Sequence, residues 1–254
     1  MTKKIALFSP KSGCGKTTLA VNLAYGLAEV SGSAVAIMDS NVSFGDVALF
    51  CNGYPKTTII EAARDLAHLS PSTLGAYLTA GGPLIRLLAS PAKPEMAELI
   101  KRHHILELME LLSAAFPYVV VDTEPGFHDL SLAACEGADV VYIIAAFNSS
   151  LGLHHVRRSL DAFHSLGYRD EKLKVVISRV PRDVGRLEWL EKELSYPVTA
   201  LLPNDFRLVA KAVNTGVPLL ATDRTSALGK GIGDVVRDSI GGDANLVTSF
   251  LQRV

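Results

Sequence analysis

The feature that most constrains the fold is an alternation of two patterns along the chain. Short, nearly continuous apolar runs alternate with longer stretches in which apolar residues recur at helical spacing. Apolar runs without polar alternation are typical of strands that are covered on both faces. The runs predict strands at residues 5–9, 34–39, 84–89, 118–122, 140–146, 174–179 and 198–202. The stretches between them predict helices at Lys16–Glu29, Pro94–Ala115, Leu151–Leu166, Val184–Leu194 and Asp205–Asn214.

Strands and helices that alternate throughout a chain indicate an α/β fold, in which crossover helices cover both faces of a parallel sheet. No long Pro/Gly/Ser linker or internal repeat divides the 254 residues. We therefore expect a single three-layer domain over residues 1–254, with a mostly parallel sheet between helices. In such sheets ligands bind beyond the carboxyl ends of the strands, so the residues at those ends carry the functional prediction.

Composition argues against several classes of protein. The chain has 25 Lys and Arg against 26 Asp and Glu, a balance that does not call for a nucleic acid partner. Three separated cysteines, Cys14, Cys51 and Cys135, argue against a disulfide framework or a zinc site. No apolar run reaches the roughly 18 residues of a membrane span, and the apolar run near the N-terminus is too short for a signal peptide. We expect a cytoplasmic protein.

The first predicted strand runs into the sequence SPKSGCGKTTLA, which opens the first predicted helix. Gly13 and Gly15 permit backbone conformations that turn successive N–H groups toward phosphate oxygens. The positive end of the helix faces the same anion. Lys16 is placed to reach the β- and γ-phosphates, and the Thr17 hydroxyl can bind Mg²⁺. The sequence thus predicts a P-loop domain whose loop binds the nucleotide through Lys11, Ser12, Gly13, Cys14, Gly15, Lys16, Thr17 and Thr18.

Two aspartates follow hydrophobic strands directly. Asp39 ends the second predicted strand, and Asp122 ends the run YVVVD. At the carboxyl edge of the sheet, beside a phosphate loop, either side chain can hold Mg²⁺ directly or through water. We predict Thr17, Asp39 and Asp122 as the metal ligands.

The loop resembles the deviant Walker A motif, KGGxGK[ST]T, of the ParA/MinD family of ATPases. Ser12 replaces the usual first glycine, which requires that its φ is not positive. The resemblance implies a homodimer in the ATP state, in which Lys11 reaches the partner's nucleotide. Asp122, followed by Pro125 and Gly126, resembles the Walker B strand and second switch of that family. The resemblance implies Lys11, Lys16, Asn41 and Asp122 as the catalytic set.

Asn41 is a departure from the family, because it stands where relatives carry the second acid of an Asp-x-Asp motif. An amide can orient water but carries no charge and is no base. We therefore expect ATP binding with slow hydrolysis. Glu124, beside the Walker B aspartate, is also unusual, and it is read either as a substitute acid or as a surface glutamate.

Base recognition is predicted from two further strand ends. A guanine-reading aspartate is missing from the segment Ile177–Pro181, which favours ATP over GTP. Relatives place an Asn-Arg pair at this position around adenine. The base-pocket candidates are accordingly Ser178, Arg179, Pro203, Asn204 and Asp205.

Three stretches narrow the resemblance to the pilus-localisation (CpaE/TadZ-type) branch: MDSNVSFGDVALF, LLASPAKPEMAELI and LPNDFRLVAKAVNTGVPLL. This branch implies a switch that positions a pilus or secretion machine, through protein partners of that machine, at a pole or beside the inner membrane.

Two other classes of function stay open. The first is a DNA-partitioning ATPase that binds DNA through the basic residues Arg157, Arg158, Arg179, Arg182, Arg186, Arg207, Lys211 and Arg224, although the net charge of −1 argues against strong affinity. The second is an iron–sulfur carrier on the same fold, and the lack of a CxxC pair argues against it. Residues 244–254 have an apolar stripe but one basic residue, so we expect a helix packed on the domain rather than a membrane anchor.

Overall fold

The apolar runs form strands that pair side by side, which satisfies their backbone N–H and C=O groups within one sheet. The computed structural model describes residues 2–147, 150–181 and 187–241. Eight strands form one sheet in the order β3-β4-β2-β5-β1-β6-β7-β8, and every neighbouring pair is parallel except β3 and β4. The strands are β1 (Lys3–Phe8), β2 (Val35–Asp39), β3 (Thr79–Gly82), β4 (Ile85–Leu88), β5 (Tyr118–Asp122), β6 (Val140–Ala146), β7 (Leu173–Val180) and β8 (Ala200–Pro203). The predicted α/β fold with a mostly parallel sheet is confirmed.

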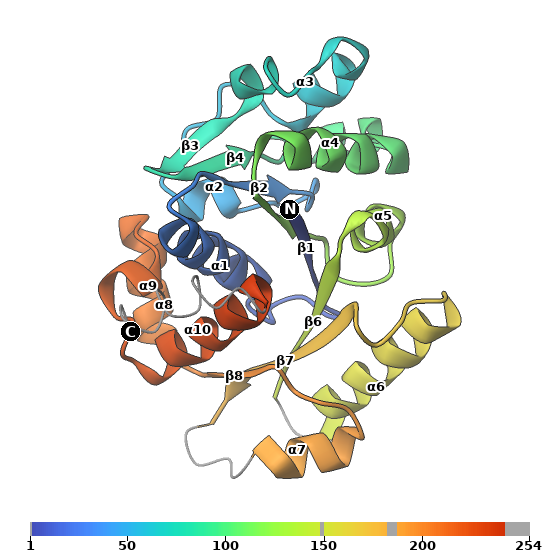
Figure 1. Ribbon diagram of the computed structural model, residues 1–254, viewed down its shortest axis with the longest axis vertical. Helices are drawn as coiled ribbons and strands as arrows, with labels where there is room; N and C mark the ends of the chain where they lie inside the picture. The colour runs from blue at the N-terminus through green and yellow to red at the C-terminus, as the bar shows by residue number, and fades with distance from the viewer. Residues whose placement is uncertain (1, 148–149, 182–186, 242–254) are drawn as a thin grey trace.

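Helices cover both faces of the sheet (Figure 1), with α1, α8, α9 and α10 on one side and α4, α5 and α6 on the other. The alternation along β1 shows how the layers form: Ile5 and Leu7 are buried with α1 and α10, whereas Ala6 and Phe8 are buried with α4, α5 and α6. The α-helices are α1 (Lys16–Ser31), α2 (Val47–Phe50), α3 (Ile59–Arg64), α4 (Arg102–Ala115), α5 (Asp129–Gly137), α6 (Ser150–Ser165), α7 (Leu187–Leu194), α8 (Phe206–Thr215), α9 (Leu219–Thr222) and α10 (Ala227–Ile240). Short 3₁₀ helices lie at η1 (Leu66–His68), η2 (Leu74–Tyr77) and η3 (Pro94–Leu99).

The strand order gathers the predicted site at one edge of the sheet. β1 lies between β5 and β6, and β5 also pairs with β2. In this register Leu7 pairs with Asp122, and Asp122 pairs with Asp39. Because all three strands are parallel, the phosphate loop after β1 and both aspartates meet at the carboxyl edge.

The single helix predicted over Pro94–Ala115 is wrong. The chain forms η3 over Pro94–Leu99 and then breaks, since Ile100 and Lys101 have extended backbone, before α4 begins at Arg102. The Ile100 side chain is buried, and this extended step places it in the core beside α4. Hydrophobic burial therefore overrides the helical spacing at this point.

Other elements were not predicted at all. β3 is a glycine-rich edge strand without an apolar run, and α9 and α10 were also missed. Of the predicted helix Val184–Leu194, the described part forms α7, and residues 182–186 lie outside the described residues. The helix predicted at 244–254 also lies outside them.

Candidate functional site

The phosphate loop has the backbone geometry that its glycines predict. Gly13 and Gly15 have φ of 72° and 86°, in the left-handed region that favours glycine. Among the described residues, the non-glycine positions with positive φ are Asn52, Arg179 and Ser195. Ser12 is not one of them, so its side chain is accommodated without strain. α1 begins at Lys16 without a side-chain cap, which leaves its first amides available to a phosphate.

Lys16 lies deep in the loop and is held by a residue that was not predicted. The residue is only 8 % exposed, and its Nζ donates to Ser9 Oγ at 2.7 Å. Burial lowers the pKa of the Lys16 ammonium, and the nearby Asp122 carboxylate opposes this shift. Ser9 Oγ in turn donates to the Lys11 carbonyl at 2.7 Å. In the sequence, only the position of Ser9 between the first strand and the loop indicated that it could belong to the site.

Asp122 and Thr17 form the part of the site that fits a divalent cation. Thr17 Oγ1 donates to Asp122 Oδ2 at 2.6 Å, which places the predicted hydroxyl and carboxylate side by side. Asp122 Oδ1 is buried and has no hydrogen-bond partner in the described structure. Within the described part of the chain, no cluster of three or more His, Cys, Asp or Glu residues could hold a metal alone. This donor set fits Mg²⁺, which usually takes one or two protein ligands and completes its shell with phosphates and water.

Asp39 has a different role in this structure. It is fully buried, and it accepts from the Asn41 N–H on Oδ1 and from the Val47 N–H on Oδ2, both at 3.2 Å. Its carboxylate therefore anchors both ends of the loop at residues 41–46. A metal contact through water, one of the two modes predicted for Asp39, leaves these bonds in place.

Burial raises the cost of ionising both carboxylates, Asp39 and Asp122. Burial raises the pKa of Asp122 to about 6, against its hydrogen bond from Thr17 and the charge of Lys16. Burial and the neighbouring Asp122 raise the pKa of Asp39 well above its ordinary range. A cation at this edge would relieve both penalties.

Substituting Asp122 by Asn is therefore expected to stabilise the magnesium-free protein above pH 6. Because the folded-state pKa of Asp122, about 6, lies above its ordinary value of 3.8, the folded state binds this proton more tightly. Stability from this group is present below pH 3.8 and is lost as pH rises through 6, a drop of about 3 kcal/mol. Urea unfolding at pH 4, 6 and 8 without magnesium measures the drop. An equal drop in Asp122→Asn would contradict the assignment.

Two adjoining cavities lie over the loop. The phosphate cavity has a volume of about 440 Å³, and the second, the base pocket, about 340 Å³. The phosphate cavity is lined by Ser12, Gly13, Cys14, Gly15, Lys16, Thr17, Thr18, Asn41, Phe44, Asp46, Phe50, Pro125 and Arg179. Arg179 lines both cavities; its φ is 55° at a bulge in β7, and its guanidinium lies beside Gly13. The cleft thus has the two compartments that a nucleotide needs.

The predicted base residues all line the base pocket, and two of them also brace it. Ser178 Oγ donates to the Cys14 carbonyl at 2.7 Å, which ties β7 to the phosphate loop. Asp205 caps α8 by accepting from the Leu208 N–H. The apolar wall of the pocket was not predicted as individual residues: Leu19, Leu202, Phe206, Val209, Leu228 and Ile232. Leu228 and Ile232 come from α10, which was not predicted.

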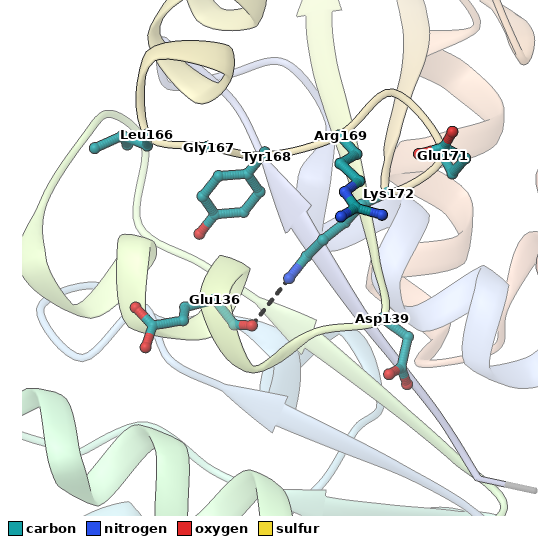
Figure 2. Close-up of a pocket in the computed structure, with 8 residues that line it drawn as sticks. All are labelled: Glu136, Asp139, Leu166, Gly167, Tyr168, Arg169, Glu171 and Lys172. Atoms are coloured by element: carbon teal, nitrogen blue, oxygen red, sulfur yellow. Dashed lines mark hydrogen bonds between the residues drawn. The ribbon is translucent and has the colours of Figure 1, made fainter.

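An unrelated cavity of about 670 Å³ lies at the opposite edge of the sheet (Figure 2), where α5 ends and β7 begins. There Lys172 Nζ donates to the Glu136 carbonyl at 2.9 Å and lies over the Tyr168 ring. None of the predicted site residues lines it, so the sequence-derived site belongs to the carboxyl edge alone.

A parallel sheet with a glycine loop leading into α1, and with Thr17 beside Asp122, defines a P-loop nucleotide-binding protein. The family described as "CobQ/CobB/MinD/ParA nucleotide binding domain" matches residues 5–219. The chain belongs to this family, whose ParA/MinD members are ATPases.

Relatives and solved structures agree with this assignment. Septum site-determining protein MinD of Thermotoga maritima is 25% identical over 260 residues, covering 99% of this chain and 93% of that protein. A ParA family ATPase from Chlorobium tepidum superposes with a TM-score of 0.84 at 20% identity, over 93% of this chain and 99% of that one. MinD from Pyrococcus horikoshii, complexed with Mg-ADP, superposes with a TM-score of 0.80 at 16% identity, over 98% of this chain and 99% of that one.

Proposed function

We propose that this ATPase is an ATP-gated dimerisation switch that hydrolyses ATP slowly and positions a cellular machine. A nucleotide with Mg²⁺ would be held by the phosphate loop, Thr17 and Asp122, and the base by the pocket between β7, β8 and α10. The Mg-ADP complex of the Pyrococcus relative supports this choice of ligands.

The observation that carries the proposal is the contrast between the two lysines of the loop. Lys16 is buried and points at Ser9 within its own loop. Lys11 is exposed, and within the described part of the chain its ammonium forms no ion pair. A lysine held outside its own phosphate cavity can contact the phosphates of a nucleotide bound to a second copy of the chain. There it would stabilise transition-state charge as an arginine finger does.

The Lys11→Ala variant tests this proposal. It is expected to bind ATP within about threefold of the unmodified chain, because its ammonium does not line its own cavity. It is also expected to lose ATP-dependent dimerisation. Size-exclusion chromatography with light scattering, with and without ATP and Mg²⁺, measures the mass, and calorimetry measures affinity. If the unmodified chain keeps one mass in all conditions, the switch is refuted. Loss of ATP binding in Lys11→Ala would show that Lys11 acts within its own subunit.

The machine we propose is a pilus or secretion assembly, on the resemblance of residues 38–50, 87–100 and 202–220 to the pilus-localisation branch. Two of these stretches surround the nucleotide cleft: residues 38–50 include the loop at 41–46, and residues 202–220 include α8. No helix among the described residues has the length and apolarity needed to span a membrane. Deletion of the gene should remove surface pili, restored by the intact chain and not by Lys16→Ala. Unchanged pili would contradict this assignment.

DNA partitioning is less well supported by the basic side chains. Arg157 pairs with Glu193, Arg224 pairs with Glu29, and Arg179 lines the nucleotide cleft. Arg182 and Arg186 lie outside the described residues. Among the described residues this leaves Arg158, Arg207 and Lys211 of the predicted basic surface, and three phosphate contacts alone do not give strong DNA affinity at physiological salt.

A further inference from the structure

Two loops border the phosphate cavity, and one unexpected carboxylate joins them. The first loop, residues 41–46, follows β2, and the second follows β5 and begins at Thr123. Glu124 in the second loop accepts two hydrogen bonds on the same oxygen, Oε1, from the first loop. The Ser43 hydroxyl donates at 2.8 Å and the Ser43 N–H at 3.2 Å.

The backbone that carries Glu124 is itself firmly held. The Glu124 carbonyl accepts from the buried Ser131 hydroxyl at 2.9 Å, and at 3.1 Å it shares the single Thr123 hydroxyl proton with a second acceptor. Thr123 Oγ1 also donates to the Leu7 carbonyl of β1 at 2.7 Å, and the Gly126 N–H donates to the Ser9 carbonyl at 2.8 Å. The Glu124 side chain therefore extends from a backbone that is fastened to β1 and α5.

The loop at 41–46 is a small closed unit. Asp39 holds both of its ends, and Asn41 spans it, donating from Nδ2 to the Phe44 carbonyl at 2.8 Å and accepting from the Phe44 N–H at 3.4 Å. Asn41 and Asp46 line the phosphate cavity, whereas Glu124 does not. The Glu124 charge still acts on Lys16, but its carboxylate bonds to the loop and is not part of the cavity wall.

We infer that Glu124 is a positioning residue whose bond to Ser43, here called the clasp, makes the two loops move as one body. This inference rests on the proposed function, since what the clasp positions is Asn41 at the phosphate cavity. It differs from a role of Glu124 as a base, because here Oε1 of the carboxylate acts as a hydrogen-bond acceptor for Ser43. The two Ser43 donors require a hydrogen-bond acceptor at this oxygen. They do not require a group that can take up a proton.

The clasp and a base predict opposite results for the matched pair Glu124→Ala and Glu124→Gln. Alanine removes the acceptor, and single-turnover ATP hydrolysis should fall by about 10- to 100-fold, the range for losing hydrogen bonds to a charged group. Glutamine keeps a carbonyl oxygen for both donors, and its rate should stay within about threefold of the unmodified chain. A base would be lost equally in both variants, so equal loss overturns the clasp.

Ser43→Ala tests the partner. It should lower the rate less than Glu124→Ala, because the Ser43 N–H remains, and it should add nothing in the Glu124→Ala background. Additive losses would overturn the clasp. Glu171→Ala, which removes an exposed glutamate at the opposite edge of the sheet, is the control and should change neither rate nor affinity.

Hydrogen exchange in the nucleotide-free protein separates failure of the clasp from failure of the proposed function. Peptides covering residues 40–50 should exchange about tenfold faster in Glu124→Ala than in Glu124→Gln or Glu171→Ala. If the unmodified chain does not hydrolyse ATP, the proposed function fails and this exchange result still decides the clasp. Unchanged exchange in Glu124→Ala overturns it.

Discussion

Replacing Lys16 by Ala is expected to weaken the binding of ATP with Mg²⁺ by at least about 100-fold, close to complete loss in a calorimetric titration. The Lys16 ammonium is nearly buried, with Ser9 Oγ 2.7 Å away, so its charge acts on the phosphates with little screening by water. Charge-assisted hydrogen bonds to phosphate are about twice as strong as neutral ones. A loss of about 3 kcal/mol in binding free energy corresponds to the expected fall of about 100-fold in affinity.

The matched control is Lys172→Ala, which removes a half-buried lysine from the cavity at the opposite edge of the sheet. It should leave ATP affinity unchanged. Thermal unfolding without nucleotide checks that Lys16→Ala is folded. Near-unchanged affinity in a folded Lys16→Ala would refute the assignment of the phosphate loop.

Replacing Asn41 by Asp is expected to raise the single-turnover rate of ATP hydrolysis by about 10- to 150-fold, with little change in ATP affinity. The bound ground state depends on Lys16, Thr17 and Asp122, which this change leaves alone. Hydrolysis also needs a water aligned with the γ-phosphate, and a carboxylate holds that water more strongly than an amide does, by about 1.4–3 kcal/mol. The amide is now bonded to the Phe44 backbone. Aspartate cannot donate to the Phe44 carbonyl, so its carboxylate would turn toward the cavity.

Asn41→Ala separates the gain of the acid from the loss of this loop bond. The Asn41→Ala variant also loses the hydrogen bond to the Phe44 carbonyl, but it introduces no carboxylate. It should therefore not accelerate hydrolysis. If Asn41→Asp leaves the rate unmoved while Asp46→Asn or Glu124→Gln cripples it, another acid has taken over the role. Of these two acids, Asp46 lines the cavity and Glu124 does not.

The sequence predicted the sheet well because a strand buried on both faces needs an uninterrupted apolar run. It missed α10 for a physical reason. Gly229, Gly231 and Gly233 lower helix propensity and are typical of loops. Yet a Cβ on Gly231 would lie 2.2 Å from the Leu201 carbonyl, so the helix packs against β8 only because this position is glycine. Tertiary packing here decides against local propensity.

The residues of the candidate site also fall into a predictable and an unpredictable group. The phosphate loop and the strand-end aspartates were predictable, since their residues are adjacent in sequence or follow recognisable strands. Ser9, and the bond between Ser43 and Glu124 across 81 positions, could not be predicted, because nothing local links a serine to its partner. Phe206, at the rim of the base pocket and 78 % exposed, lies in the recognised stretch 202–220, but nothing in that stretch singled it out.

The two cavities of the cleft share four lining residues, Cys14, Gly15, Thr18 and Arg179, and differ in the rest. The phosphate cavity is completed by residues of the segment 41–50 and by Pro125, whereas the base pocket takes much of its wall from α8 and α10. Substitutions at Phe206, Leu228 or Ile232 change the surface that meets the base and leave the phosphate cradle intact. The fit to a base can therefore change by substitution on α8 and α10 without a change in the residues that line the phosphate cavity.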